Sequence, residues 1–173
     1  YNLCDAQVRL AAKYSYPLLP GSATDSVLYG LQDIRGCSFD TDVDGDAKSE
    51  ILLTNYRLSG RVHVFEAVGN DSIALKWTSP ALGAASSPST NISPRYAIFG
   101  DLDNDGKKEV ITQASNHGIY IFEWDGVVGS DNYGTLPSQI IDTTFLSGAT
   151  GNVEYMEVLD IDGIARASRS HDM

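Results

Sequence analysis

Two acidic segments of this sequence align without a gap, and a hydrophobic stretch follows each of them. They run from Asp42 to Ile51 and from Asp101 to Val110, with carboxylates at positions 1, 3, 5 and 9 of both. Oxygen atoms on alternate residues of a tight loop can converge on one point, and a flexible cage of oxygens suits Ca2+ better than Mg2+. The sequence therefore predicts two calcium sites, formed by Asp42, Asp44, Asp46 and Glu50 and by Asp101, Asp103, Asp105 and Glu109.

The spacing of the two loops indicates a structural repeat. Asp101 lies 59 residues after Asp42, and a further step of the same length reaches Asp160, which opens a shorter acidic segment with Asp162. A fixed period of this size is typical of arrays of supersecondary units. The third copy has no carboxylate at positions 5 and 9, so we expect a weak metal site or none there.

The residues between the loops predict four strands in each period. Short runs of β-branched and aromatic residues end at turn residues such as Asn, Asp and Gly, which is typical of strands and hairpins. The predicted strands are residues 37–39, 50–54, 60–66 and 72–77 in the first period, and 95–100, 109–113, 119–124 and 139–145 in the second. Each set of four is expected to form one antiparallel sheet, and no helix longer than a turn or two is expected.

Partial units are expected at both ends of the chain. Residues 10–17 resemble the fourth strand of the first unit, and residues 153–158 resemble a first strand. We therefore divide the chain into residues 1–35, 36–94, 95–152 and 153–173. The first part holds a last strand and a connection, the middle two are complete units, and the last holds a first strand and a tail.

The loops and their flanking strands resemble the FG-GAP and VCBS repeat family, which forms the calcium-loop blades of integrin alpha-chain propellers and of many bacterial and algal extracellular proteins. Its Asp-x-Asp-x-Asp-Gly-x-x-Asp/Glu loop joins the first two strands of a blade. The resemblance implies bound Ca2+ in both loops, and it implies that Lys48 and Lys107, at position 7, contribute backbone carbonyls. Ala47 departs from the pattern because it replaces the usual glycine, so we expect a strained or differently bent turn if φ is positive there.

The fold implied by the resemblance is all-β, with tandem four-stranded antiparallel propeller-type blades, two complete and two partial. Propellers typically close with at least four blades, so an open array rather than a closed ring is expected within this chain. Unpaired terminal strands invite association.

Two functions are expected from this architecture. One is a calcium-binding extracellular module with a structural or adhesive role that self-assembles through its incomplete blades. The other is a fragment of a larger propeller receptor or enzyme whose ligand or active site lies outside this chain.

Other interpretations of the acidic loops are weaker. An EF-hand requires a bidentate Glu at position 12, where this chain has Leu53 and Thr112. Paired carboxyl groups also serve glycosidases, but acids two residues apart on one loop, present twice, fit a cation better. The three histidines do not have the spacing of zinc ligands, and no Gly-x-Ser-x-Gly motif occurs. We therefore expect no enzymatic activity and no catalytic residue.

Composition narrows the range of partners. The formal net charge is −11, and two bound Ca2+ would change it to about −7. The 12 Lys and Arg residues are scattered, which argues against nucleic acid. No apolar run approaches the roughly 20 residues that span a membrane. We expect a secreted, extracellular protein whose partners are Ca2+, other copies of itself or missing blades, and a protein or glycan ligand.

A few positions are candidates for modification or recognition. Asn70 and Asn91 begin Asn-x-Ser sequons, which accept glycans in secreted proteins. Cys4 and Cys37 either form one disulfide in an oxidising compartment or remain two separate thiols. Trp77 and Tyr133 are either core aromatics or exposed recognition residues, as large amphipathic side chains serve both purposes.

Overall fold

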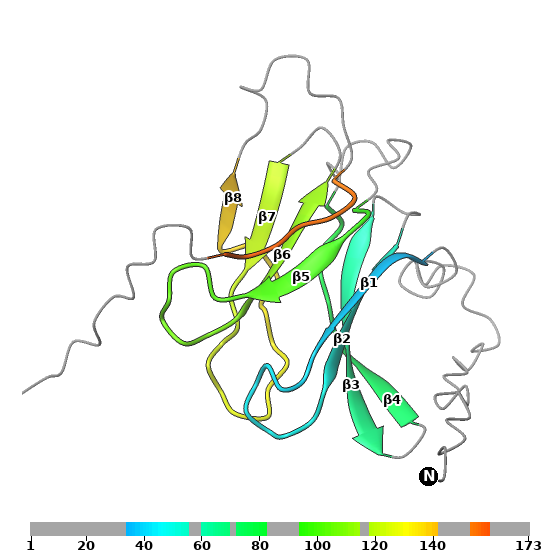
Figure 1. The fold of residues 1–173 in the computed structure, drawn as a ribbon, viewed down its shortest axis with the longest axis vertical. Coiled ribbons are helices and arrows are strands. Elements are labelled where there is room, and N and C mark those ends of the chain that lie inside the picture. The colour runs from blue at the N-terminus through cyan, green and yellow to red at the C-terminus, as the bar shows by residue number, and fades with distance from the viewer. Residues whose placement is uncertain are drawn as a thin grey trace, which may run out of the picture.

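The computed structural model describes residues 34–55, 60–69, 72–82, 94–114, 118–141 and 153–159. Within these ranges the chain forms two four-stranded antiparallel sheets and no helix (Figure 1). Neither sheet closes on itself in the described part of the chain, so the predicted fold of open propeller-type blades is confirmed.

The first sheet has the strand order β1-β2-β3-β4, so each strand pairs with its neighbour in the sequence. Its strands are β1 (Ile34–Asp40), β2 (Glu50–Asn55), β3 (Arg61–Gly69) and β4 (Ser72–Thr78). Asp40 pairs with Glu50, so the first acidic loop closes the β1–β2 hairpin. β3 is central and buries residues 62–66 in succession, as expected for a strand covered on both faces.

The second sheet repeats this order as β5-β6-β7-β8. Its strands are β5 (Ala97–Gly100), β6 (Glu109–Ala114), β7 (Gly118–Phe122) and β8 (Gln139–Ile141). Gly100 pairs with Glu109, so the second acidic loop closes the β5–β6 hairpin. The eight strands predicted for the two complete units are all present, with most ends shifted by a few residues. Of the last predicted strand, residues 142–145 lie outside the described part of the chain.

A hydrophobic core joins the two sheets, and Trp77 on β4 is one of its main residues. The Trp77 ring lies 5.2 Å from that of Phe122 and 5.3 Å from that of Tyr133, measured between centroids. Its Nε1 donates a hydrogen bond to the Gly134 carbonyl at 2.8 Å. Trp77 is 8% exposed and Tyr133 is 1% exposed. Both are core residues, and the alternative that they are exposed recognition residues is wrong.

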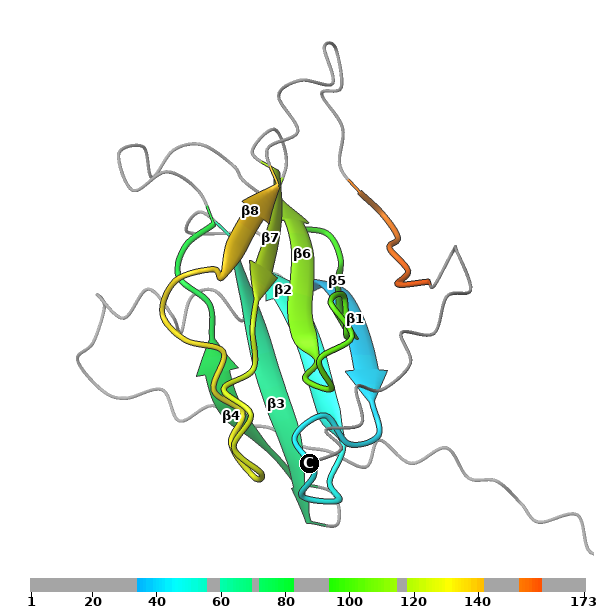
Figure 2. The same cartoon turned by 90° about the vertical axis from the view of Figure 1, so that its left-hand side faces the viewer.

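The long connection between β7 and β8 brings part of the second unit onto the first. Residues 123–138 extend away from β7 and β8 and lie beside β3 and β4 (Figure 2). The Gly129 amide donates to the Asp44 carbonyl at 3.2 Å, which fixes this connection against the first acidic loop. The two units are therefore joined by this connection as well as by the packing of their sheets.

Strands β1 and β5 lie side by side and contact each other through corresponding residues of the repeat. Ser38 Oγ donates to the Ala97 carbonyl at 2.6 Å, and these residues are 59 positions apart. Lys108 Nζ forms an ion pair with Asp40 of β1. The contact between consecutive first strands thus follows the sequence period.

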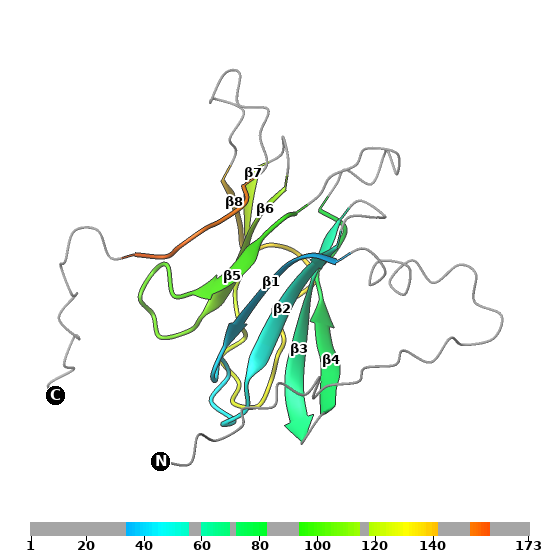
Figure 3. The ribbon, with the colours of Figure 1, turned by 45° about the vertical axis from the view of Figure 1, so that its right-hand side comes forward.

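Residues 153–159 lie beside β5 without forming a strand (Figure 3). Arg95 Nη1 donates to Glu154 Oε1 at 2.6 Å, again across 59 positions, and the rings of Tyr96 and Tyr155 are 5.6 Å apart. The structure records no strand at residues 153–159, and the segment that would pair with a first strand there lies outside the described residues, so the first strand at 153–158 stays a prediction. Residues 153–159 nevertheless lie next to β5 in the way that β5 lies next to β1.

Several predicted features lie outside the described residues, and one cysteine can be placed. Cys37 is exposed and free among the described residues, and the predicted disulfide is not tested because its partner, Cys4, is not described. The features outside the described residues are the strand at 10–17, Cys4, the sequons at Asn70 and Asn91, the acids Asp160 and Asp162, and the tail.

Candidate metal centres

The second loop brings its four predicted carboxylates together. One oxygen of each of Asp101, Asp103, Asp105 and Glu109 lies within 4.8 Å of the other three. The Asp105 amide donates to Asp101 Oδ1 at 3.1 Å and to Asp103 Oδ1 at 3.2 Å. The same side chains therefore bend the loop and gather the oxygens, which is the arrangement that a calcium loop requires.

The glutamate at position 9 has the same hydrogen-bond pattern in both loops. Oε2 of Glu50 accepts a hydrogen bond from the Val43 amide at 2.6 Å, and Oε2 of Glu109 accepts one from the Leu102 amide at 2.7 Å. Oε1 of each glutamate is buried and has no hydrogen-bond partner. Burial raises the pKa of both carboxyl groups to about 7. A cation beside Oε1 would remove the cost of burying the charge.

The first loop does not gather its four predicted ligands at one point. Oxygens of Asp42, Asp44 and Asp46 lie within 4.8 Å of one another, whereas Glu50 forms a group with Asp46 and Glu66. The turn is bent differently, since Asp42 accepts a hydrogen bond from the amide three residues later, at 2.8 Å. Its counterpart in the second loop accepts from amides four and five residues later.

Both loops place residues 4 and 6 in the left-handed region of backbone space. The φ angles are 78° at Gly45 and 66° at Ala47 in the first loop, and 60° at Asn104 and 91° at Gly106 in the second. A residue with a Cβ is strained in this region, whereas glycine is not. Ala47 therefore carries the strain that the sequence led us to expect.

Replacing Ala47 by glycine should relieve this strain. We expect A47G to raise the free energy of unfolding by about 0.5–1 kcal/mol, since the left-handed conformation costs an L residue about 1–2 kcal/mol and the greater entropy of glycine in the unfolded chain offsets part of the gain. Urea unfolding in calcium buffer measures the change. The matched variant G106A should lose stability, because Gly106 has a φ of 91°. An A47G protein no more stable than the original would contradict the assignment.

Two further acids approach the loops from the third strands. Glu66 is in β3 and Glu123 directly follows β7, and they occupy the same position in the aligned segments 62–66 and 119–123. Lys48 Nζ lies 3.3 Å from Glu66 Oε2, and Lys107 Nζ lies 3.7 Å from Glu123 Oε1. The repeated glutamate was a signal in the sequence that our prediction did not use. The backbone carbonyls of the two lysines remain predicted ligands.

A third acid, Asp131, comes from the connection between β7 and β8. The Asp131 carboxylate lies close to those of Asp44 and Glu66, because one oxygen of each is within 4.8 Å of the other two. Burial, followed by the charges of Asp44 and Glu66, raises the pKa of Asp131 to about 6. No local pattern marks this residue, because its neighbours in space belong to the other unit.

The described histidine does not form part of a metal centre. His63 on β3 is fully buried, and its Nδ1 lies 3.0 Å from Thr78 Oγ1. Burial lowers its pKa to about 4, so the ring is neutral at neutral pH. His117 and His171 lie outside the described residues.

The fold and the loops together define a class of protein: open propeller-type β-blades in which an acidic loop joins the first two strands. Comparison with protein families agrees, because residues 42–112 match the model of a family described as an FG-GAP-like repeat. The match begins at the first carboxylate of the first loop and ends within β6, so it includes both loops. The predicted resemblance to the FG-GAP and VCBS repeat family is confirmed over this range.

Comparisons with curated proteins and with solved structures find no similar protein. A search of the described residues for a helix of sufficient length and apolarity to cross a membrane finds none.

Proposed function

We propose that this chain is a calcium-binding, extracellular β-repeat module with a structural or adhesive role. The observation that carries the proposal is the convergence of Asp101, Asp103, Asp105 and Glu109 on one point, with Oε1 of Glu109 buried and without a hydrogen-bond partner. Four carboxylates held this close repel one another unless a cation lies between them. All the ligands are carboxylate oxygen atoms, from one short loop and the first residue of the strand that follows it, and such ligands favour Ca2+.

The ion is proposed to hold the first hairpin of each blade together. Each loop closes a pair of antiparallel strands, and its position-9 glutamate is the first residue of the second strand of that pair. A cation bound to the loop thus fixes the end of the hairpin. Extracellular calcium modules commonly have dissociation constants of about 10⁻⁴ to 10⁻³ M, which suits a secreted protein.

A structural role fits these loops better than catalysis. The acids recur at the same four sequence positions in two successive units, whereas an active site needs one distinct arrangement of acid, base or nucleophile. We therefore propose no enzymatic reaction for this chain. The loops and the inter-sheet core support a scaffold that presents its exposed connections to a protein or glycan ligand.

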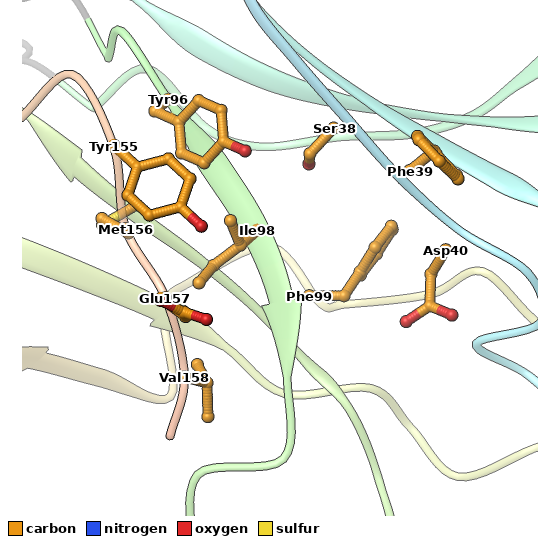
Figure 4. A pocket seen from close by; sticks show the side chains of 10 residues that line it. All are labelled: Ser38, Phe39, Asp40, Tyr96, Ile98, Phe99, Tyr155, Met156, Glu157 and Val158. Carbon is orange, nitrogen blue, oxygen red and sulfur yellow. The ribbon is translucent and has the colours of Figure 1, made fainter.

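Assembly is the second part of the proposal. Residues 153–159 lie against β5 and, with β1 and β5, line an open pocket of mixed character (Figure 4). Its side chains are aromatic and aliphatic residues together with the polar or acidic Ser38, Asp40 and Glu157. Phe39 and Tyr155 in this pocket are 76% and 66% exposed. An exposed apolar surface beside an unpaired segment is typical of a contact site. We propose that strands from another copy of the chain complete the unit that begins at residue 153.

One experiment tests both parts. Calcium is titrated into metal-free protein by calorimetry, while light scattering follows the mass in solution. We expect at least two binding events in the original chain and the loss of one in E109Q, which removes the charge beneath the second loop. E154Q is the matched control for the binding heat alone, because Glu154 is an exposed acid outside the loops but lies in the segment proposed to contact another copy.

The outcomes separate calcium binding from assembly. Mass that rises with protein concentration in calcium supports assembly between copies, and a monomer at all concentrations contradicts it. Absence of binding heat up to about 10 mM calcium, well above the usual range of extracellular modules, would contradict the proposed metal sites.

A further inference from the structure

An acidic cluster lies between the two units, next to the first loop. It consists of Asp44 from the loop, Glu66 from β3 and Asp131 from the β7–β8 connection, and we call it the inter-unit cluster. One carboxylate oxygen of each lies within 4.8 Å of the other two. Asp44 and Glu66 are fully buried, and Asp131 is 7% exposed. Three separate segments supply these groups, so a single acidic turn does not explain their convergence.

Buried oxygens of this cluster have no hydrogen-bond donor. These atoms are Oδ2 of Asp44 and both carboxylate oxygens of Asp131. The Asp131 side chain is 2% exposed, so water does not replace the missing donors from the open surface. Buried carboxylates are stable only when they are paired, hydrogen-bonded or bound to a metal.

The nearby lysines neutralise the cluster only in part, mainly at Glu66. Lys76 Nζ lies 2.8 Å from Glu66 Oε1 but 3.9 Å from Asp131 Oδ2, and Lys48 Nζ lies 3.3 Å from Glu66 Oε2. Lys76 therefore approaches Glu66 most closely, whereas Lys48 pairs with Asp46 as well as with Glu66, and the two lysine side chains are 31% and 43% exposed. Among the described residues, no lysine or arginine forms an ion pair with Asp44.

We propose that the inter-unit cluster binds a divalent, oxygen-preferring cation of the calcium class, with Asp131 as a ligand supplied by the second unit to the first. The proposal rests on the proposed function only in that Asp44 also belongs to the first loop. Three carboxylates from separate segments give the charge and the hard oxygen ligands that such an ion requires. The oxygens of Asp44 and Asp131 that lack a hydrogen-bond donor are the atoms that would coordinate this cation.

Such an ion would join two units rather than one hairpin. The β7–β8 connection already contacts the first unit through the hydrogen bond from Gly129 to the Asp44 carbonyl and the one from Trp77 to the Gly134 carbonyl. A cation held by Asp131 and Asp44 adds a charged link at the same place. The second loop has Glu123 as the counterpart of Glu66 but no counterpart of Asp131 among the described residues.

The test compares D131N with the original full-length chain by thermal unfolding, once with EDTA and once with about 5 mM calcium, a concentration above the usual dissociation constants of extracellular sites. With calcium, we expect D131N to melt at a lower temperature, because a ligand is lost. With EDTA, we expect it to melt at the same or a higher temperature, because one of three buried like charges is removed. Calorimetric titration should show one binding step weakened by about tenfold or more, with the second loop unaffected.

Two further variants keep the result unambiguous. E66Q removes another ligand of the cluster and also the ion-pair partner of Lys76 and Lys48, so it should melt at a lower temperature in both conditions, with the larger loss in calcium. D125N is the matched control, because Asp125 lies in the same connection but is exposed and only accepts hydrogen bonds from within it, such as that from Ser130 Oγ at 2.9 Å. D125N should lower the melting temperature equally with calcium and with EDTA.

The outcomes distinguish this site from the proposed loop sites. If D131N shifts the melting temperature equally in both conditions and leaves the titration unchanged, the inter-unit site is wrong while the loop sites stand. If the original chain binds no calcium at all, both proposals are wrong. If D131N shows the reversal and E66Q loses more in calcium than in EDTA, while E109Q alone removes the second-loop step, both are supported.

Discussion

Removing calcium with excess EDTA should lower the melting temperature of this chain by about 10–20 °C. A ligand present at 100 times its dissociation constant adds about 2.7 kcal/mol per site to the free energy of unfolding, so two occupied loops add about 5 kcal/mol. In a chain of this size, each kcal/mol shifts the melting temperature by about 2–4 °C. Circular dichroism or calorimetry with and without EDTA measures the shift.

The controls identify the ion and the place where it acts. Added calcium in excess over EDTA should restore the melting temperature, and the same concentration of magnesium should restore it less, because Mg2+ requires a stricter octahedral geometry than a flexible loop provides. The double variant E50Q/E109Q should respond to EDTA much less than the original chain. A melting temperature that does not change in EDTA would contradict a stabilising role for the metal.

Replacing Trp77 by alanine should cost about 3–5 kcal/mol of stability, as is usual for a large aromatic side chain removed from a core. Trp77 contacts both Phe122 of the second sheet and Tyr133 of the β7–β8 connection, and its indole nitrogen is bonded to Gly134. The substitution leaves a cavity where the two units meet. Urea unfolding in saturating calcium measures the change without altering metal occupancy.

Two comparison variants separate packing from the hydrogen bond. W77F keeps an aromatic ring but removes the N–H donor, so the Gly134 carbonyl loses its partner and we expect a smaller loss than in W77A. L136A alters a side chain in the same connection that is 76% exposed, and it should change stability by less than about 0.5 kcal/mol. A W77A protein as stable as L136A would show that Trp77 does not join the units.

Most of the repeated sheet could be predicted from the sequence because its signals are local. The turn residues and the β-branched runs set the strands, and the two acidic loops are found between the first two strands of each sheet. The strand predicted at 153–158 depends on contacts that are not local in the sequence. Its residues resemble a first strand, but a strand also needs a partner ladder, and this segment contacts β5 through side chains such as Glu154 and Tyr155.

The site was partly predictable for the same reason. The spacing within the second loop is sufficient to gather its carboxylates, whereas the first loop is also shaped by Ala47 and by groups that reach it from elsewhere. Asp131 approaches the first loop only because the β7–β8 connection folds back across β3 and β4. That path depends on the packing of Trp77 and Tyr133, which no short segment of sequence specifies.

A crystal structure of the chain grown in calcium tests the central claim most directly. We expect density for an ion at the centre of the second loop, with oxygens of Asp101, Asp103, Asp105 and Glu109 at about 2.3–2.6 Å, the distances typical of calcium ligands. A water molecule or no density at that point, with the four carboxylates turned away from one another, would contradict it.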